Sequence, residues 1–281
     1  MGTLVLAAKV THVPSMFISE REGPFKGCRT PAIEGLQELG RRLVASGCDT
    51  AVVLDTHWLV NSGYHINACA SFEGIYTSNE FPHFIQNLRY RYEGNPALGD
   101  AIADLATSNG VRTRSHHIET LDVEYGTLVP LHFMRASQRL RIVSIAAWCA
   151  FSSMEESRTV GEAIRRAIDL SDSRVALIAS GSLSHRIHDN RVVEEGGLTI
   201  SDEFYRQVDL RALDLWQQGR FLEFTAMLPT YARACHGEGW MHDTAMLLGA
   251  LGWDRYSGHV EILTPYFPSS GTGQVNAVFP I

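Results

Sequence analysis

The sequence has few cysteines, and they follow no pattern. Its 281 residues include five cysteines at wide spacing, without any C-x-x-C pair. They are Cys28, Cys48, Cys69, Cys149 and Cys235. An odd number at such spacing predicts neither a disulfide framework nor a thiolate zinc site. We therefore expect a reducing, cytoplasmic environment.

Long apolar runs and clusters of positive charge are also missing. The N-terminal apolar run is far shorter than the roughly 20 residues of a membrane span, and no basic segment precedes it. Lysine occurs only at Lys9 and Lys26, the formal net charge is −7, and no basic patch could follow a phosphate backbone. Membrane and nucleic-acid partners are therefore not expected, whereas a small molecule is.

The chain instead has enough apolar residues for a large core. Its hydrophobic content is 45%, and no linker, composition shift or internal repeat divides it. We expect residues 1–281 to form a single domain.

Short apolar runs alternate with amphipathic stretches over the first two thirds of the chain. Such runs are typical of buried parallel strands, and the stretches between them are typical of helices. The strands are predicted at Leu4–Val10, Thr50–Thr56, Arg141–Trp148 and Arg174–Ser180, and the helices at Ala32–Ser46, Pro96–Ser108 and Ser157–Leu170. This alternation predicts an α/β fold of three layers, α/β/α, around a central, mostly parallel sheet.

The C-terminal third is more helical and ends in two strand-like runs that can pair. Helices are predicted at Ser201–Gln218 and Met241–Leu251, and strands at Val260–Phe267 and Val275–Pro280. At the earlier Pro96 helix, Asn95 is the expected N-cap, with proline at the first helical position.

Three histidines come directly after predicted strands. His12 follows the first strand, His57 the second and His185 the fourth. The carboxyl ends of parallel strands meet at one edge of a sheet, where ligands of such folds bind, and neighbouring strands are only about 5 Å apart. Each histidine taken alone could be a turn residue bonded to the backbone. Their coincidence favours one shared site.

A carboxylate is needed to complete a metal site, and the segment HGEGWMHD offers candidates. Glu238 lies between two glycines, and His236, His242 and Asp243 lie beside it. Spacing alone does not choose among them. Two imidazoles and one carboxylate leave open metal positions, as in non-haem Fe(II) sites that use O2. A zinc hydrolase could use the same residue types, although zinc usually keeps one open position.

Longer motifs connect these residues to a known family. They include THVPSM, DTHWLVN, YTSNEFPHFI, EYGTLVP, ASGSLSHR, GEGWMHD and FPSSGTGQVNAVFP. With them the chain resembles the class III (LigB-type) extradiol ring-cleaving dioxygenases over essentially its whole length. The resemblance implies a single LigB-type catalytic domain.

The resemblance also implies roles for particular residues. It implies an Fe(II) site formed by His12, His57 and Glu238, with His185 as the catalytic acid and base. Many relatives carry a second active-site histidine in a D-H-G-T-like segment, where this chain has Tyr125 between Glu124 and Gly126. Tyr125 is therefore expected to supply a hydroxyl in place of an imidazole.

The implied reaction uses O2 to cleave a catechol ring beside its diol. The favoured substrate is 3,4-dihydroxyphenylacetate, which would give 5-carboxymethyl-2-hydroxymuconate semialdehyde, and another catechol or a 2-aminophenol is the alternative. A divalent-metal hydrolase and a non-catalytic binding module on the same fold are more distant alternatives. We also expect a homo-oligomer.

Overall fold

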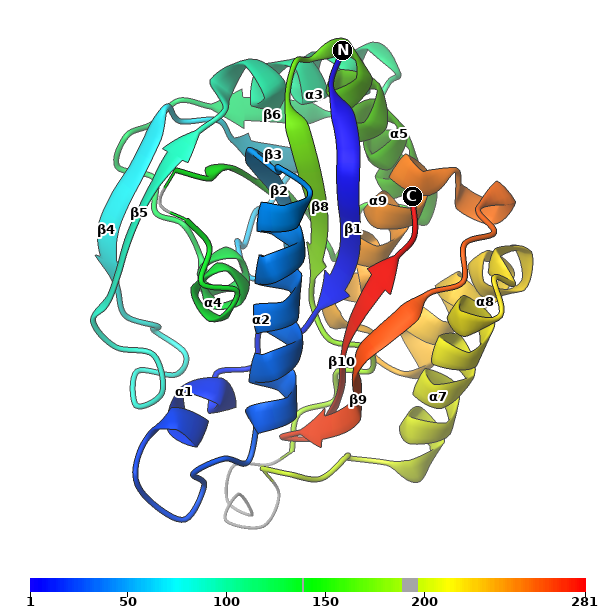
Figure 1. Ribbon diagram of the computed structural model, residues 1–281. Coiled ribbons are helices and arrows are strands. Elements are labelled where there is room, and N and C mark those ends of the chain that lie inside the picture. The colour runs from blue at the N-terminus through cyan, green and yellow to red at the C-terminus, as the bar shows by residue number, and fades with distance from the viewer. Residues whose placement is uncertain (138, 189–196) are drawn as a thin grey trace.

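A computed structural model describes residues 1–137, 139–188 and 197–281 (Figure 1). In chain order its elements are β1 Thr3–Val10, α1 Ser15–Glu20, α2 Thr30–Ala45, β2 Thr50–Asp55, β3 Tyr64–Asn67, β4 Ser71–Tyr76, β5 Leu88–Gly94, α3 Pro96–Ser108, β6 Thr113–His116, α4 Tyr125–Phe133, β7 Arg141–Ala147, α5 Met154–Leu170, β8 Arg174–Ser180, α7 Glu203–Gln217, α8 Phe221–Ala234, the short turn η2 Glu238–Met241, α9 His242–Leu251, η3 Trp253–Arg255, β9 Glu261–Ser269 and β10 Thr272–Phe279. Within these residues no helix is both long and apolar enough to cross a bilayer.

The strands form one mixed sheet whose centre is parallel. The main order is β4-β5-β7-β2-β8-β1-β10-β9, and β3 and β6 pair beside β7. Strands β5, β7, β2, β8 and β1 run parallel, whereas β4, β10 and β9 are antiparallel to their neighbours. Val10 and Asp55 both pair with Ser180. The ends of β1, β2 and β8 therefore lie side by side at one edge of the sheet; Figure 1 shows the arrowheads of β1 and β8 there.

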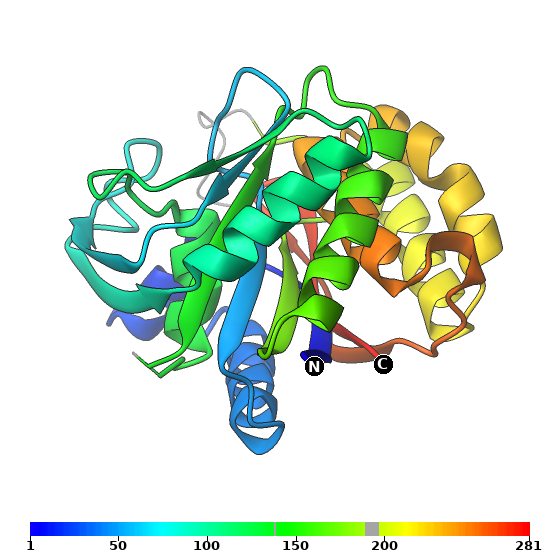
Figure 2. The same ribbon diagram turned by 90° about the horizontal axis from the view of Figure 1, so that it is seen from above.

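Helices cover both faces of the sheet (Figure 2). Alternate side chains of β2 enter different cores, since Ala51 and Val53 pack with α2 and α4, whereas Val52 and Leu54 pack with α3, α5 and α9. The C-terminal helices α7 and α8 extend the core that contains Val52 and Leu54 toward β10. This arrangement confirms the predicted three-layer α/β/α fold with a mostly parallel centre.

All the predicted helices and strands are present within a few residues of their expected bounds, and the last two strands pair as expected. The predicted helix at Ser157–Leu170 begins earlier, at Met154, because Ser153 and Glu156 form a capping box. The strands β3 and β6, the hairpin β4–β5 and helices α1, α4 and α8 were not predicted.

Asn95 caps α3 as predicted and also connects the helix to the sheet. Its side-chain oxygen accepts from Leu98 N at 3.2 Å, and its amide donates to Thr50 Oγ1 and Ser173 Oγ, each at 3.1 Å. The side chain is buried. One residue therefore satisfies a helix end and two buried hydroxyls.

We expect Asn95→Ala to lower the free energy of unfolding by about 2 kcal/mol, since it removes a cap and leaves buried polar groups without a partner. Urea denaturation measures this. Asn109→Ala at the exposed end of the same helix is the matched control and should change stability by less than about 0.5 kcal/mol. Equal effects of the two substitutions would contradict the role assigned to Asn95.

Candidate metal centre

The carboxyl ends of β1, β2 and β8 bring three predicted site residues to one edge of the sheet. His12 lies two residues after β1, His57 two residues after β2, and His185 at the end of the segment that follows β8. Because β8 lies between β1 and β2 in the sheet, the three backbone segments are neighbours. The shared edge expected from the sequence is therefore present.

Glu238 lies at this edge as the first residue of η2, a short irregular turn. Gly239, Trp240 and Met241 all have left-handed backbone angles, with φ of 51°, 55° and 61°. For residues other than glycine this conformation costs roughly 1–2 kcal/mol each. Glu238 itself is buried, and its Oε2 accepts from both the backbone N–H and the hydroxyl of Ser182.

The two imidazoles converge on one oxygen of this carboxylate. His12 Nε2 and His57 Nε2 each lie 3.0 Å from Glu238 Oε1. Among the residues that the structure describes, His12, His57 and Glu238 form the one group whose ligand atoms all lie within 4.8 Å of one another. Thr56 Oγ1 donates to the same oxygen at 2.8 Å.

Hydrogen bonds at the other ring nitrogen of His12 orient it for a metal. Ser180 Oγ donates its hydrogen to the carbonyl of Gly126, so it accepts from His12 Nδ1–H at 3.0 Å. The proton of the neutral ring is therefore on Nδ1, and Nε2 carries the lone pair that faces Glu238. Such partners behind a metal-binding histidine fix its tautomer and orientation.

Asp55 fixes the segment that carries His57. Its Oδ1 accepts from the backbone N–H of His57 at 2.7 Å, and its Oδ2 accepts from Thr127 Oγ1 at 2.6 Å. A side chain at Gly126 would place its Cβ only 2.3 Å from Asp55 Oδ1. Glycine is required there because the carboxylate lies directly against the start of α4.

Electrostatics keep Glu238 ionised. Burial alone would raise its pKa, but the charges of His12 and His185 and the N–H groups of His12 and His57, when these rings are protonated, hold the pKa well below its ordinary value. For His57, burial lowers the pKa, yet the hydrogen bond and charge of Glu238 outweigh burial, and the pKa is raised. The site thus contains a buried negative charge that attracts cations.

His185 lies beside this cluster and is connected to it through a serine. Ser182 Oγ donates to Glu238 Oε2 at 2.5 Å and accepts from His185 Nδ1–H at 2.7 Å. The neutral ring therefore has its lone pair on Nε2. Burial lowers the pKa of His185 below the ordinary value, which favours this neutral form. A partly exposed imidazole in this state can accept a proton.

Tyr125 lies at the first residue of α4, with its hydroxyl in the site. The hydroxyl is 2.8 Å from His57 Nε2 and donates to Glu80 Oε2 at 3.2 Å. Burial, and then the charge of Glu80, raise the pKa of Tyr125. The phenol stays protonated and can donate a hydrogen bond.

The other candidates from the HGEGWMHD segment lie outside the cluster. His242 is hydrogen-bonded to Ser157 Oγ at 2.7 Å and to the carbonyl of Cys149 at 3.1 Å, and Asp243 pairs with Lys9. The ring of His236 packs edge-on against Tyr205, with 6.0 Å between centroids. Of the candidates in this segment, Glu238 is the one whose ligand atom lies beside those of His12 and His57.

Sequence reasoning did not assign a role to several residues that support the site. These are Asp55, Ser180, Ser182 and Glu80, and the first three lie within two or three residues of a predicted site residue or at a strand end. Hydroxyl and carboxylate side chains next to strand-end histidines were the available signal. Glu80 is distant from the others in sequence, and only the fold brings it near Tyr125.

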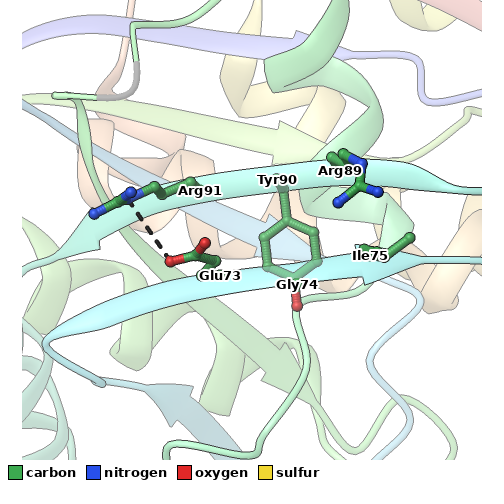
Figure 3. Close-up of a pocket in the computed structure, with 6 residues that line it drawn as sticks. All are labelled: Glu73, Gly74, Ile75, Arg89, Tyr90 and Arg91. Atoms are coloured by element: carbon green, nitrogen blue, oxygen red, sulfur yellow. Dashed lines mark ion pairs between the residues drawn. The ribbon is translucent and has the colours of Figure 1, made fainter.

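A surface hollow elsewhere on the chain lies on the hairpin of β4 and β5 (Figure 3). Its lining includes Glu73 and Arg91, which form an ion pair at 3.8 Å. None of its lining residues belongs to the metal cluster, and the hollow carries no comparable group of ligands.

Comparison with known proteins places the chain in a family. Residues 6–280 match the family described as the catalytic LigB subunit of aromatic ring-opening dioxygenase. The chain is 53% identical to an Escherichia coli protein named 3,4-dihydroxyphenylacetate 2,3-dioxygenase, over 95% of this chain and 97% of that one. It is 28% identical to the 2-aminophenol 1,6-dioxygenase beta subunit of a Pseudomonas species, over 69% and 68% of the two chains.

A crystal structure of an uncharacterised protein from Escherichia coli K12 has a similar fold. The TM-score is 0.65 at 16% sequence identity, and the match covers 98% of this chain and 100% of that chain. At this identity the likeness concerns the fold alone. The family match and the identity to a curated relative support one conclusion: the chain belongs to the LigB family of aromatic ring-opening dioxygenases.

Proposed function

We propose that the chain is an Fe(II)-dependent extradiol dioxygenase that cleaves 3,4-dihydroxyphenylacetate to 5-carboxymethyl-2-hydroxymuconate semialdehyde. His12, His57 and Glu238 are the proposed metal ligands. The observation that carries the proposal is the approach of both Nε2 atoms to 3.0 Å from Glu238 Oε1. Membership of the LigB family supports the reaction class.

The donor set fits a divalent metal. Ligand atoms bonded at about 2.1 Å and at right angles to one another lie about 3 Å apart, which is the spacing found between the carboxylate oxygen and each imidazole nitrogen. Two neutral imidazoles and one carboxylate are a ligand set of non-haem Fe(II) oxygenases. When bound, the iron would supply a centre at which the catechol diol and O2 are held together and exchange electron density.

The proposed role of His185 is proton transfer. Its Nε2 hydrogen-bonds to no group in the described part of the chain, while Nδ1–H is held by Ser182. The imidazole can therefore remove a proton from a catechol hydroxyl at Nε2 and return it later to an oxygen of the opening ring. In the overall reaction the ring C–C bond beside the diol breaks, one oxygen atom of O2 ends in the aldehyde and the other in the carboxyl group, and no external reductant is needed.

The proposed role of Tyr125 is to donate a hydrogen bond. Its hydroxyl lies beside a ligand nitrogen of His57, and its raised pKa keeps the phenol protonated. The single O–H points to Glu80 Oε2 at 3.2 Å, and we propose that it turns to an oxygen atom at the metal when substrate binds.

The relatives support the choice of substrate. The protein that matches at 53% identity is named for 3,4-dihydroxyphenylacetate, and the one that matches at 28% is named for 2-aminophenol. We therefore place 2-aminophenol second. We further propose one catalytic domain over residues 1–281, self-association into a homo-oligomer, and a reducing cytoplasm, which the five free cysteines support.

Reconstitution tests the reaction. We expect the apoprotein, loaded anaerobically with Fe(II), to consume one O2 per 3,4-dihydroxyphenylacetate, with a higher kcat/KM than for catechol, protocatechuate or 2-aminophenol. An oxygen electrode and product absorbance measure this. A protein loaded with Zn(II) is the control. No O2 uptake with any substrate would contradict the function, and preference for 2-aminophenol would contradict only the substrate.

We expect His57→Ala to lose stoichiometric iron, because one of three ligands is removed. His117→Ala is the matched control, since this exposed ring pairs with Asp100 outside the site. Anaerobic reconstitution followed by metal analysis measures iron per chain. Full iron occupancy in His57→Ala would refute the ligand assignment.

We expect His185→Phe to retain iron but to lose turnover by roughly 100-fold or more, the usual effect of removing a positioned acid and base. Steady-state O2 consumption measures the rate, and metal analysis checks the iron content. His117→Phe should keep the full rate. Undiminished turnover in His185→Phe would remove this residue from the mechanism.

A further inference from the structure

A buried ion pair lies next to the proposed metal site and has no part in the proposed chemistry. Lys9 Nζ and the carboxylate of Asp243 form this pair, and the two side chains are 0% and 1% exposed. Lys9 lies on β1, three residues before His12, and Asp243 lies on α9, five residues after Glu238. The pair therefore connects the strand of one proposed ligand with the turn of another.

The segment that follows β8 contacts both this ion pair and Glu238. Gly181 is the residue before Ser182, whose N–H and hydroxyl bind Glu238. A Cβ at Gly181 would lie 2.8 Å from Asp243 Oδ2 and 3.1 Å from Lys9 Nζ. In the segment after β8, Gly181 thus lies against the ion pair, and the next residue, Ser182, binds the carboxylate of Glu238.

The turn between Glu238 and Asp243 needs external support. Its left-handed residues Trp240 and Met241 carry side chains, and such conformations persist only where the surroundings hold them in place. The first two residues of the helix that follows hold it in place: His242 bonds to Ser157 on α5 and to the carbonyl of Cys149, and Asp243 pairs with Lys9 on β1. Of these, only the ion pair reaches a strand that carries a proposed ligand.

The energetics of buried ion pairs indicate that this pair does not serve stability alone. Removing two charges from water is costly, and apolar residues of similar size are often as stable as a buried ion pair. We infer that Lys9 and Asp243 are positioning residues that set the distance between His12 and Glu238 and thereby tune metal affinity. This inference rests on the proposed metal centre.

The test separates metal affinity from folding. The variant Lys9→Met/Asp243→Leu removes both charges, and Asp243→Asn removes one. The matched control is Asp49→Asn/Arg141→Gln. It removes an ion pair at the amino ends of β2 and β7, which lie away from the edge that carries the metal site. Co(II) affinity of each folded apoprotein is measured by titration at fixed pH, and the melting temperature of the apoprotein is measured separately.

We expect the double variant Lys9→Met/Asp243→Leu to bind Co(II) roughly 10- to 100-fold more weakly, the usual effect of losing a group that orients a metal ligand. Its apoprotein should melt near the wild-type temperature, and the control should bind Co(II) as the wild type does. Asp243→Asn should weaken Co(II) binding as well.

Wild-type Co(II) affinity in the folded double variant would overturn the inference, because a merely structural pair changes the melting temperature alone. Failure of the metal centre itself would look different. In that case the wild type would bind no Co(II), or His57→Ala would bind it as tightly as the wild type, and both proposals would fall together.

Discussion

The approach of two imidazole nitrogens to one buried carboxylate oxygen is the contact on which the rest of the site depends. Oε1 of Glu238 lies 3.0 Å from a nitrogen of both His12 and His57. A buried carboxylate is costly unless its charge is compensated. Ser182 and Thr56 donate hydrogen bonds to Glu238, whereas neutral His12 turns the lone pair of Nε2 toward it. A divalent cation would compensate the charge more completely, so the site is built to bind one.

The fold supplies this contact through the level ends of three parallel strands. Pairing of Val10 and Asp55 with Ser180 puts two ligand-bearing segments on either side of β8, and the turn η2, which precedes α9, brings the carboxylate of Glu238 to the same edge. Two glycines make room for the supporting carboxylates, since Gly126 lies against Asp55 and Gly181 against Asp243. Strand ends and one turn thus place the proposed ligands, while His185 remains partly exposed.

Much of this could be predicted from local sequence. The buried strands follow from apolar runs, and the Asn95 cap follows from an asparagine directly before a proline. Histidines at strand ends indicate a site at the sheet edge. The choice of Glu238 over His242 could not be made from spacing, because it depends on a left-handed turn at Trp240 and Met241. The β4–β5 hairpin was missed although its side chains alternate in burial. Glu80 was missed because tertiary structure alone brings it to Tyr125.

The central claim is that His12, His57 and Glu238 hold the catalytic iron. Anomalous diffraction at the iron edge from crystals reconstituted anaerobically with Fe(II) measures this most directly. We predict one strong peak per chain, bounded by His12 Nε2, His57 Nε2 and a carboxylate oxygen of Glu238. A peak at another group of residues, or none at these three in crystals of the active protein, would contradict the account.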